Sequence, residues 1–165
     1  LSSGSSYSHF SGKEDILINA INERLNNVKE LYETLPEGAG PQAILEPIHP
    51  NQLVNDNFSA MLRIRAKSLH APEIARATAD TMPLLQGIIV KTLTPWAAEQ
   101  LSVLHEINPN SAQRTPEQEA LIADYARDTA DAFMMVFQGY MLRSFFGTPK
   151  EKDRLYRVAS ALLPE

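Results

Sequence analysis

Residues 1–17 read LSSGSSYSHFSGKEDIL, and this stretch decides how the rest of the chain is interpreted. A serine near its start is a suitable N-cap for a short helix that ends at Phe10, and a Ser-Gly pair then makes a tight turn. Lys13 opens a much longer helix, with two acids in its first turn, where the helix dipole favours them. A short helix of small residues, a sharp turn and a long helix are typical of the second half of a helix-turn-helix unit.

The same stretch resembles the recognition helix and the following linker helix of the tetracycline-repressor (TetR) family of bacterial transcription regulators. The family pattern has serine and glycine at the helix start, then Tyr, any residue, His-Phe, two residues, Lys-Glu and an apolar pair. Seven positions match it in order and spacing: Tyr7, His9, Phe10, Lys13, Glu14, Ile16 and Leu17. Two positions depart from it, since Ser6 replaces a large aliphatic residue and Ser8 replaces an aromatic or basic one. The resemblance is sharp over residues 2–17 and is architectural beyond them.

The first residue lies inside this motif, so we expect the sequence to lack the two helices that precede the recognition helix in the family. We therefore predict that residues 1–12 are the end of a helix-turn-helix DNA-binding domain. Residues 13–165 are predicted to form a helical ligand-binding and dimerisation domain.

Composition excludes several classes of protein. The 165 residues are 44% hydrophobic and 21% charged, which is typical of a globular domain. No cysteine is present, so a disulfide framework, a cysteine metal site and a thiol nucleophile are excluded. No apolar run approaches the roughly 20 residues of a membrane helix, so we expect no membrane partner. The absence of cysteine fits a reducing cytosol, and the resemblance implies a cytoplasmic, bacterial protein. The formal charge of −5 confines any DNA contact to the N-terminal part.

Apolar residues recur at intervals of three and four along most of the chain, which predicts an all-α fold. The residues predict a helix-turn-helix remnant, and the resemblance implies that a helical ligand-binding and dimerisation bundle of the TetR type follows it. A proline pair predicts a turn or broken helix over 42–50, and Pro95 predicts a kink or a restart. The helices are expected over 13–35, 51–69, 72–79, from about 81 past Pro95, 116–146 and 149–163.

The helix over 116–146 is the longest, and it is apolar on two sides. A helix of this kind must be covered on both sides. We predict that its second face and the last helix form a four-helix bundle with a second copy of the chain. The alternative is that other parts of one chain cover this face. The predicted homodimer interface comprises Ala132, Met135, Gly139, Leu142, Phe146, Leu155, Val158 and Leu162.

The resemblance also implies DNA-contacting residues. The tyrosine and the linker-helix lysine that match the family, Tyr7 and Lys13, would bind operator DNA phosphates, which fixes register without reading sequence. His9 would add a backbone contact, and small residues would face the groove, namely Ser3, Gly4, Ser5 and Ser8. The alternative is that Tyr7 and His9 pack internally and that Lys13 is solvated.

In the TetR family the inducer pocket lies among the middle helices and the long penultimate helix. Aromatic rings and flexible methionines suit a small hydrophobic ligand, although such residues at helical spacing also form ordinary cores. The predicted ligand-binding residues are Met61, Met82, Trp96, Phe133, Phe137 and Tyr140. Polar groups that could orient the ligand are Arg63, His70, Gln86 and Gln138.

No catalytic, metal-binding or cofactor-binding set is predicted. Glu46 and His49 have the E-x-x-H spacing of di-iron bundles, but prolines interrupt the segment and no second copy occurs. His105-Glu106 does not extend to H-E-x-x-H, and nucleotide-binding glycine patterns are absent. The chain is therefore not expected to be an enzyme.

The resemblance implies a ligand-responsive transcriptional repressor. Ligand in each body would reorient the linker helix and separate the two recognition helices beyond one turn of DNA, roughly 34–36 Å. Two alternatives remain: a helical small-molecule-binding module without DNA binding, and a helical enzyme with a convergent site that the sequence does not display.

Overall fold

A computed structural model describes residues 13–48, 59, 62–66, 69–70, 72–105, 107–108 and 110–165. Within these ranges every regular element is a helix and no strand occurs, which confirms the predicted all-α fold class. The elements are α1 (Lys13–Glu33), α2 (Pro41–Leu45), η1 (Glu46–Ile48), α4 (Pro72–His105), η2 (Ser111–Gln113), α5 (Pro116–Phe145) and α6 (Pro149–Ala161), where η denotes a 3-10 helix.

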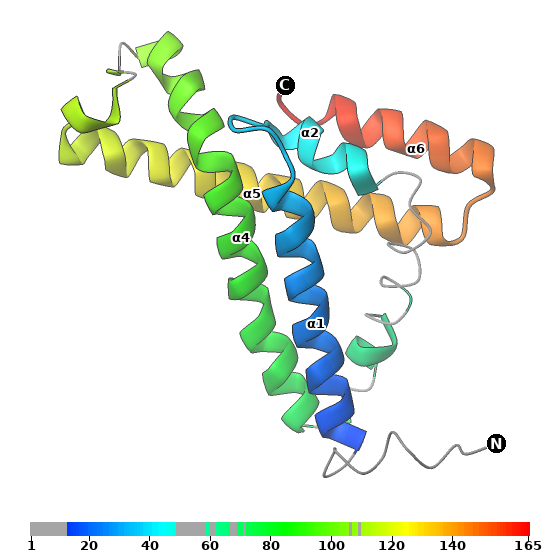
Figure 1. Cartoon of the computed structure of the whole chain (residues 1–165). Coiled ribbons are helices and arrows are strands. Elements are labelled where there is room, and N and C mark those ends of the chain that lie inside the picture. Colours follow the sequence, from blue (N-terminus) through cyan, green and yellow to red (C-terminus); the bar gives the residue numbers. More distant parts are fainter. Residues whose placement is uncertain are drawn as a thin grey trace.

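The helices form two crossed layers. α1 and α4 lie side by side and run in the same direction, and α5 crosses them (Figure 1). α6 returns along α5 in the opposite direction, and the short α2 contacts α5 (Figure 1). Since α1 begins at Lys13, its N-terminal end directly follows the stretch that resembles a recognition helix.

Two capping boxes start the last two helices. The Thr115 hydroxyl accepts a hydrogen bond from the Gln118 amide at 3.3 Å, and the Thr115 amide donates to Gln118 Oε1 at 3.0 Å. Thr148 and Glu151 repeat the arrangement before α6. In both helices a proline occupies the first turn, where its missing N–H leaves no bond unmade. The predicted start at Thr115 is confirmed.

α4 corrects one expectation. The sequence predicts one helix ending near residue 79 and another starting near 81, but α4 is continuous over 34 residues and contains Pro83 and Pro95. A proline within a helix leaves the carbonyl four residues earlier without its intrahelical partner. Pro83 and Pro95 are exposed, as are Ala79 and Lys91, whose carbonyls lose that partner, so water can bind these carbonyls. Of the two outcomes predicted at Pro95, a restart is therefore excluded.

The other predicted bounds agree with the structure within a few residues. The broken segment after Pro41 is the pair α2 and η1, and Gly38, with φ of 80°, helps to turn the chain into it. Of the helix predicted over 51–69, only residues 59 and 62–66 are described as helical. Among the described helices, none combines the length and the apolarity needed to cross a membrane.

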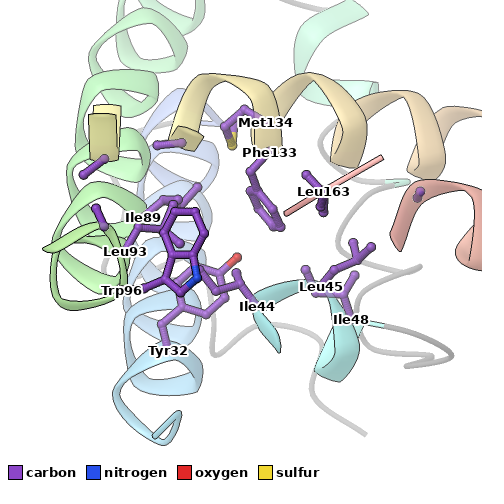
Figure 2. Packing of buried hydrophobic residues seen from close by; sticks show 14 of the residues in the cluster. Tyr32, Ile44, Leu45, Ile48, Ile89, Leu93, Trp96, Phe133, Met134 and Leu163 are labelled. Atoms are coloured by element: carbon purple, nitrogen blue, oxygen red, sulfur yellow. The ribbon is translucent and has the colours of Figure 1, made fainter. Parts of the chain in front are cut away.

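The main core forms where α5 crosses α4. Phe133 of α5 is completely buried, and it packs in one cluster with Ile89 and Leu93 of α4 and with Ile44 and Leu45 of α2. Figure 2 shows these side chains converging with Trp96, Tyr32 and Leu163, which come from α4, α1 and the segment after α6. The core thus joins every described α-helix to the α4–α5 pair.

Hydrogen bonds hold the C-terminal segment over this core. The Trp96 indole N–H donates to the Glu165 carbonyl at 2.7 Å, and the Gln42 side-chain amide donates to the Leu163 carbonyl at 3.0 Å. Gly40 lies directly beneath: a Cβ added there would lie 2.8 Å from Trp96 Nε1 and 3.1 Å from the Glu165 carbonyl carbon. This close approach requires glycine at position 40.

We predict that Gly40→Ala lowers the free energy of unfolding by about 1–3 kcal/mol, because the added methyl group overpacks the Trp96 contact. Gly87→Ala is the matched control, since a Cβ at Gly87 of α4 meets nothing within 4 Å. Alanine is the better helix former, so this variant should gain up to about 1 kcal/mol. Urea unfolding of both variants provides the test, and equal effects would contradict the steric argument.

Candidate functional site

A cavity of about 180 Å³ lies between α1, α4 and α5. The residues that line it are Ile21, Leu25, Val28, Leu31, Tyr32, Ile48, Ile64, Arg65, Thr78, Thr81, Met82, Leu85, Ile89, Phe133, Met134, Phe137 and Met141.

The cavity lies between two separate clusters of buried residues. Tyr32, Ile89 and Phe133 belong to the main core, while Ile21 and Ile64 belong to a small cluster with Ile74 near the N-terminal ends of α1 and α4. Between the clusters, Leu25 and Val28 of α1 line the cavity. The N-terminal part of α1 is therefore held by a small apolar cluster and separated from the main core by unfilled space.

Few polar groups face this space. The Thr78 hydroxyl donates to the Ile74 carbonyl at 2.7 Å, and the Thr81 hydroxyl donates to the Ala77 carbonyl at 2.6 Å, so neither proton is available to a ligand. Among the described lining residues Arg65 alone carries a charge. Its Nη2 lies 3.9 Å from the Met82 sulfur, a weak acceptor.

Tyr32 supplies the other polar group. Burial raises the pKa of the Tyr32 hydroxyl above its ordinary value of 10.0, with no hydrogen bond to offset it. Every fully buried side-chain nitrogen or oxygen atom of the described residues has a hydrogen-bond partner. The Tyr32 hydroxyl has no hydrogen-bond partner within the described chain, so this oxygen cannot be fully buried. Part of the 7% of the Tyr32 surface that remains exposed must therefore belong to the hydroxyl. Because Tyr32 lines the cavity, we infer that this hydroxyl opens into it.

Three of the six predicted ligand-binding residues line the cavity: Met82, Phe133 and Phe137. The rings of Phe133 and Phe137 stack with centroids 6.0 Å apart. Met61 lies outside the described residues.

The other two predicted ligand-binding residues lie elsewhere in the fold. Trp96 stacks on Tyr125 at 5.7 Å and bonds the Glu165 carbonyl. Tyr140 meets Tyr156 of α6 edge to face at 6.3 Å. Each is therefore engaged in packing away from the cavity, since the ring of Trp96 serves the C-terminal segment and that of Tyr140 serves the α5–α6 contact.

The four polar residues considered for orienting a ligand do not line the cavity. Arg63 and His70 are exposed, and the Gln86 side chain donates to Asp131 at 2.5 Å on the surface. Arg65, which was not among the four, is the charged residue that lines the cavity. Arg65 follows Leu62 by three residues, which is a helical spacing, and Leu62 packs against the main core. The sequence pattern around Arg65 therefore indicated that this side chain could face the interior.

The predicted DNA-contacting residues Ser3, Ser5, Tyr7, Ser8 and His9 lie outside the described residues. For Lys13 the structure describes the backbone, which opens α1.

The predicted interface residues form an apolar surface on α5 and α6. Those that are large and exposed are Met135, Leu142, Phe146, Val158 and Leu162. Between the two helices lies an open hollow lined by Met135, Gly139, Leu155, Val158 and Leu162, together with Val136, Tyr140, Arg143 and Ala159. Ala132, the one predicted interface residue not yet placed, is half-buried, and Leu155 also packs partly against the main core. No described element covers the exposed residues.

The described residues contain no group of three or more His, Cys, Asp or Glu side chains placed to hold a metal ion. Glu46, half of the E-x-x-H pair, begins η1, and His49 is outside the described residues.

Comparison of the chain with protein-family models, with curated proteins and with solved structures finds no match.

We predict that Tyr32→Phe raises the free energy of unfolding by about 1 kcal/mol, because it removes a desolvated hydroxyl without breaking a bond. Since burial raises the pKa of Tyr32, the unfolded chain loses this proton first, and wild-type stability falls as the pH rises above 10. The variant should lose less stability in that range. Urea unfolding at pH 7 and above pH 10 measures both effects, and a loss of 1 kcal/mol or more at pH 7 would mean that the hydroxyl is bonded.

Proposed function

We propose that this chain is the body of a ligand-responsive, DNA-binding transcriptional repressor of the TetR type. The observation that carries the proposal is the cavity beneath α1. That helix begins within the stretch in which seven positions agree with a recognition helix and its linker, so occupancy of the cavity and the position of the DNA-contacting end share one element.

Packing suggests how the two would be coupled. The N-terminal part of α1 is attached to α4 through the small cluster of Ile21, Ile64 and Ile74, and the cavity separates this cluster from the main core. A ligand that fills the space would contact α1, α4 and α5 together and favour one orientation of α1. It would shift the DNA-binding equilibrium by as much as its affinity differs between the two orientations.

A two-fold dimer completes the proposal. The apolar surface of α5 and α6 contains five large side chains with at least half of their surface exposed, which is typical of a surface that another protein covers. Two copies that meet through this surface would form a four-helix bundle with an isologous interface. Such a dimer would hold two copies of α1 at a defined spacing, as binding to two DNA half-sites requires.

The DNA-binding proposal predicts site-selective, salt-dependent binding. In fluorescence anisotropy the full-length gene product should bind its own upstream intergenic DNA more tightly than a scrambled duplex. The logarithm of the binding constant should fall linearly with the logarithm of salt concentration. Lys13→Ala should weaken binding and reduce the salt slope by about 1 per copy.

Phe137→Ala is the matched variant, because Phe137 lines the cavity. It should leave DNA affinity nearly unchanged and alter the response to any inducer found by screening for loss of the anisotropy signal. Flat anisotropy at low salt would instead favour a binding module without a DNA role, and equal loss of both properties in either variant would contradict this division of labour.

The dimer predicts that Met135→Glu and Val158→Glu, which place charges in the hollow between α5 and α6, convert the protein to monomers. Sedimentation velocity or light scattering gives the mass directly. Leu84→Glu of α4 is the matched control, since Leu84 is 58% exposed and Val158 is 53% exposed. A monomeric wild-type protein, or Glu variants that remain dimeric, would exclude this interface.

A further inference from the structure

The cavity is mainly apolar, but two polar groups in its lining restrict the chemistry of a ligand. Arg65 is the one charged residue among its described lining residues, and the Tyr32 hydroxyl, which keeps part of the residue's exposed surface, has no hydrogen-bond partner in the described chain. Apolar side chains supply most of the remaining lining. A ligand matched to this lining is apolar along its length and polar at the two points that these groups reach.

The two polar groups lie at different levels of the cavity. Arg65 directly follows Ile64 of the small cluster, whereas Tyr32 belongs to the main core (Figure 2). The cavity lies between these two clusters, so the two groups come from opposite ends of it. The ligand is therefore elongated, with one polar atom near each end.

The chemistry of each group selects a different ligand atom. A guanidinium ion binds a carboxylate through two parallel hydrogen bonds, and such charge-assisted bonds are about twice as strong as neutral ones. A protonated phenol donates to a neutral oxygen, and Tyr32 is protonated at neutral pH, since the ordinary pKa of its hydroxyl is 10.0 and burial raises that pKa further.

The volume of the cavity limits the size of the ligand. An apolar cavity of about 150 Å³ admits a molecule of benzene size, so a space of about 180 Å³ suits a short chain or a single ring. We propose that the ligand of this cavity is a small, elongated, apolar carboxylic acid. Its carboxylate pairs with Arg65, and an oxygen at its far end accepts a hydrogen bond from Tyr32. The biological role of this ligand rests on the proposed function, whereas the binding experiments that test the ligand class do not.

Titration calorimetry on the full chain, without DNA, tests the Arg65 half of the proposal. The probes are octanoate, octan-1-ol and octylammonium, which share one chain and differ in head-group charge. Octanoate should bind with one site per chain and at least tenfold more tightly than octan-1-ol, and octylammonium should bind more weakly still. Arg65→Gln should abolish the preference for octanoate while leaving octan-1-ol unchanged.

The probe 8-hydroxyoctanoate tests the Tyr32 half. It should bind several-fold more tightly than octanoate to the wild-type protein, and Tyr32→Phe should remove that gain without affecting octanoate. Equal affinity for octanoate and octan-1-ol, an Arg65→Gln variant that retains the preference, or no binding of any probe would overturn the proposal.

The outcome separates this inference from the proposed function. Charge-selective binding by a protein that does not bind DNA would support the ligand class and reject the repressor. Salt-dependent DNA binding without charge-selective binding of octanoate would support the repressor and reject the ligand class.

Discussion

The crossing of α5 over α4 is the contact on which the rest of the structure depends. Phe133 is completely buried at this crossing, and the helices on either side reach the core by packing against the same pair. α2 contributes Ile44 and Leu45, α1 contributes Tyr32, and the segment after α6 closes the core through Leu163. Because these elements share one cluster, a change in any of them reaches the α4–α5 contact.

The same crossing explains why there is a cavity. α1 packs beside α4 along its length, while α5 meets the pair at an angle, so the three helices come together at one end and diverge at the other (Figure 1). Side chains such as Val28 and Thr78 are too short to fill the space that results. The small cluster around Ile21 then holds α1 to α4 beyond the cavity.

The long helix α5 divides the molecule into two surfaces. One side carries Phe133 and Met141 into the core, and the other exposes Met135 and Leu142 beside α6. Arg143 lies at the hollow between the two helices, so a partner there would meet an apolar surface edged by positive charge. The cavity and the exposed apolar surface thus lie on opposite sides of one helix.

Sequence periodicity was sufficient for the helices because local signals set their bounds. Thr115 with Gln118 marked the start of α5, and the loop after α1 ended that helix as expected. It was insufficient for α4, because a proline is usually a helix breaker, and only the exposure of Pro83 and Pro95 allows water to replace the missing bonds.

The site was harder to predict than the fold. Periodicity separates an inward from an outward side chain, but it does not say whether an inward side chain meets another side chain or empty space. Phe133 and Trp96 therefore have the same signature in sequence, although one lines the cavity and the other holds the C-terminal segment. The spacing from Leu62 could have indicated that Arg65 faces inward, but that Arg65 and Tyr32 line the same cavity became visible only after the helices were packed.

The sequence by itself determined that the chain is helical, where most helices begin and end, and that α5 has two apolar sides. These properties follow from the 3.6-residue period and from capping groups within a few residues of one another. Only the tertiary structure decided which apolar side is buried, where a cavity remains and which polar groups face it. Those outcomes depend on the angles at which distant helices pack, and short-range sequence patterns do not encode such angles.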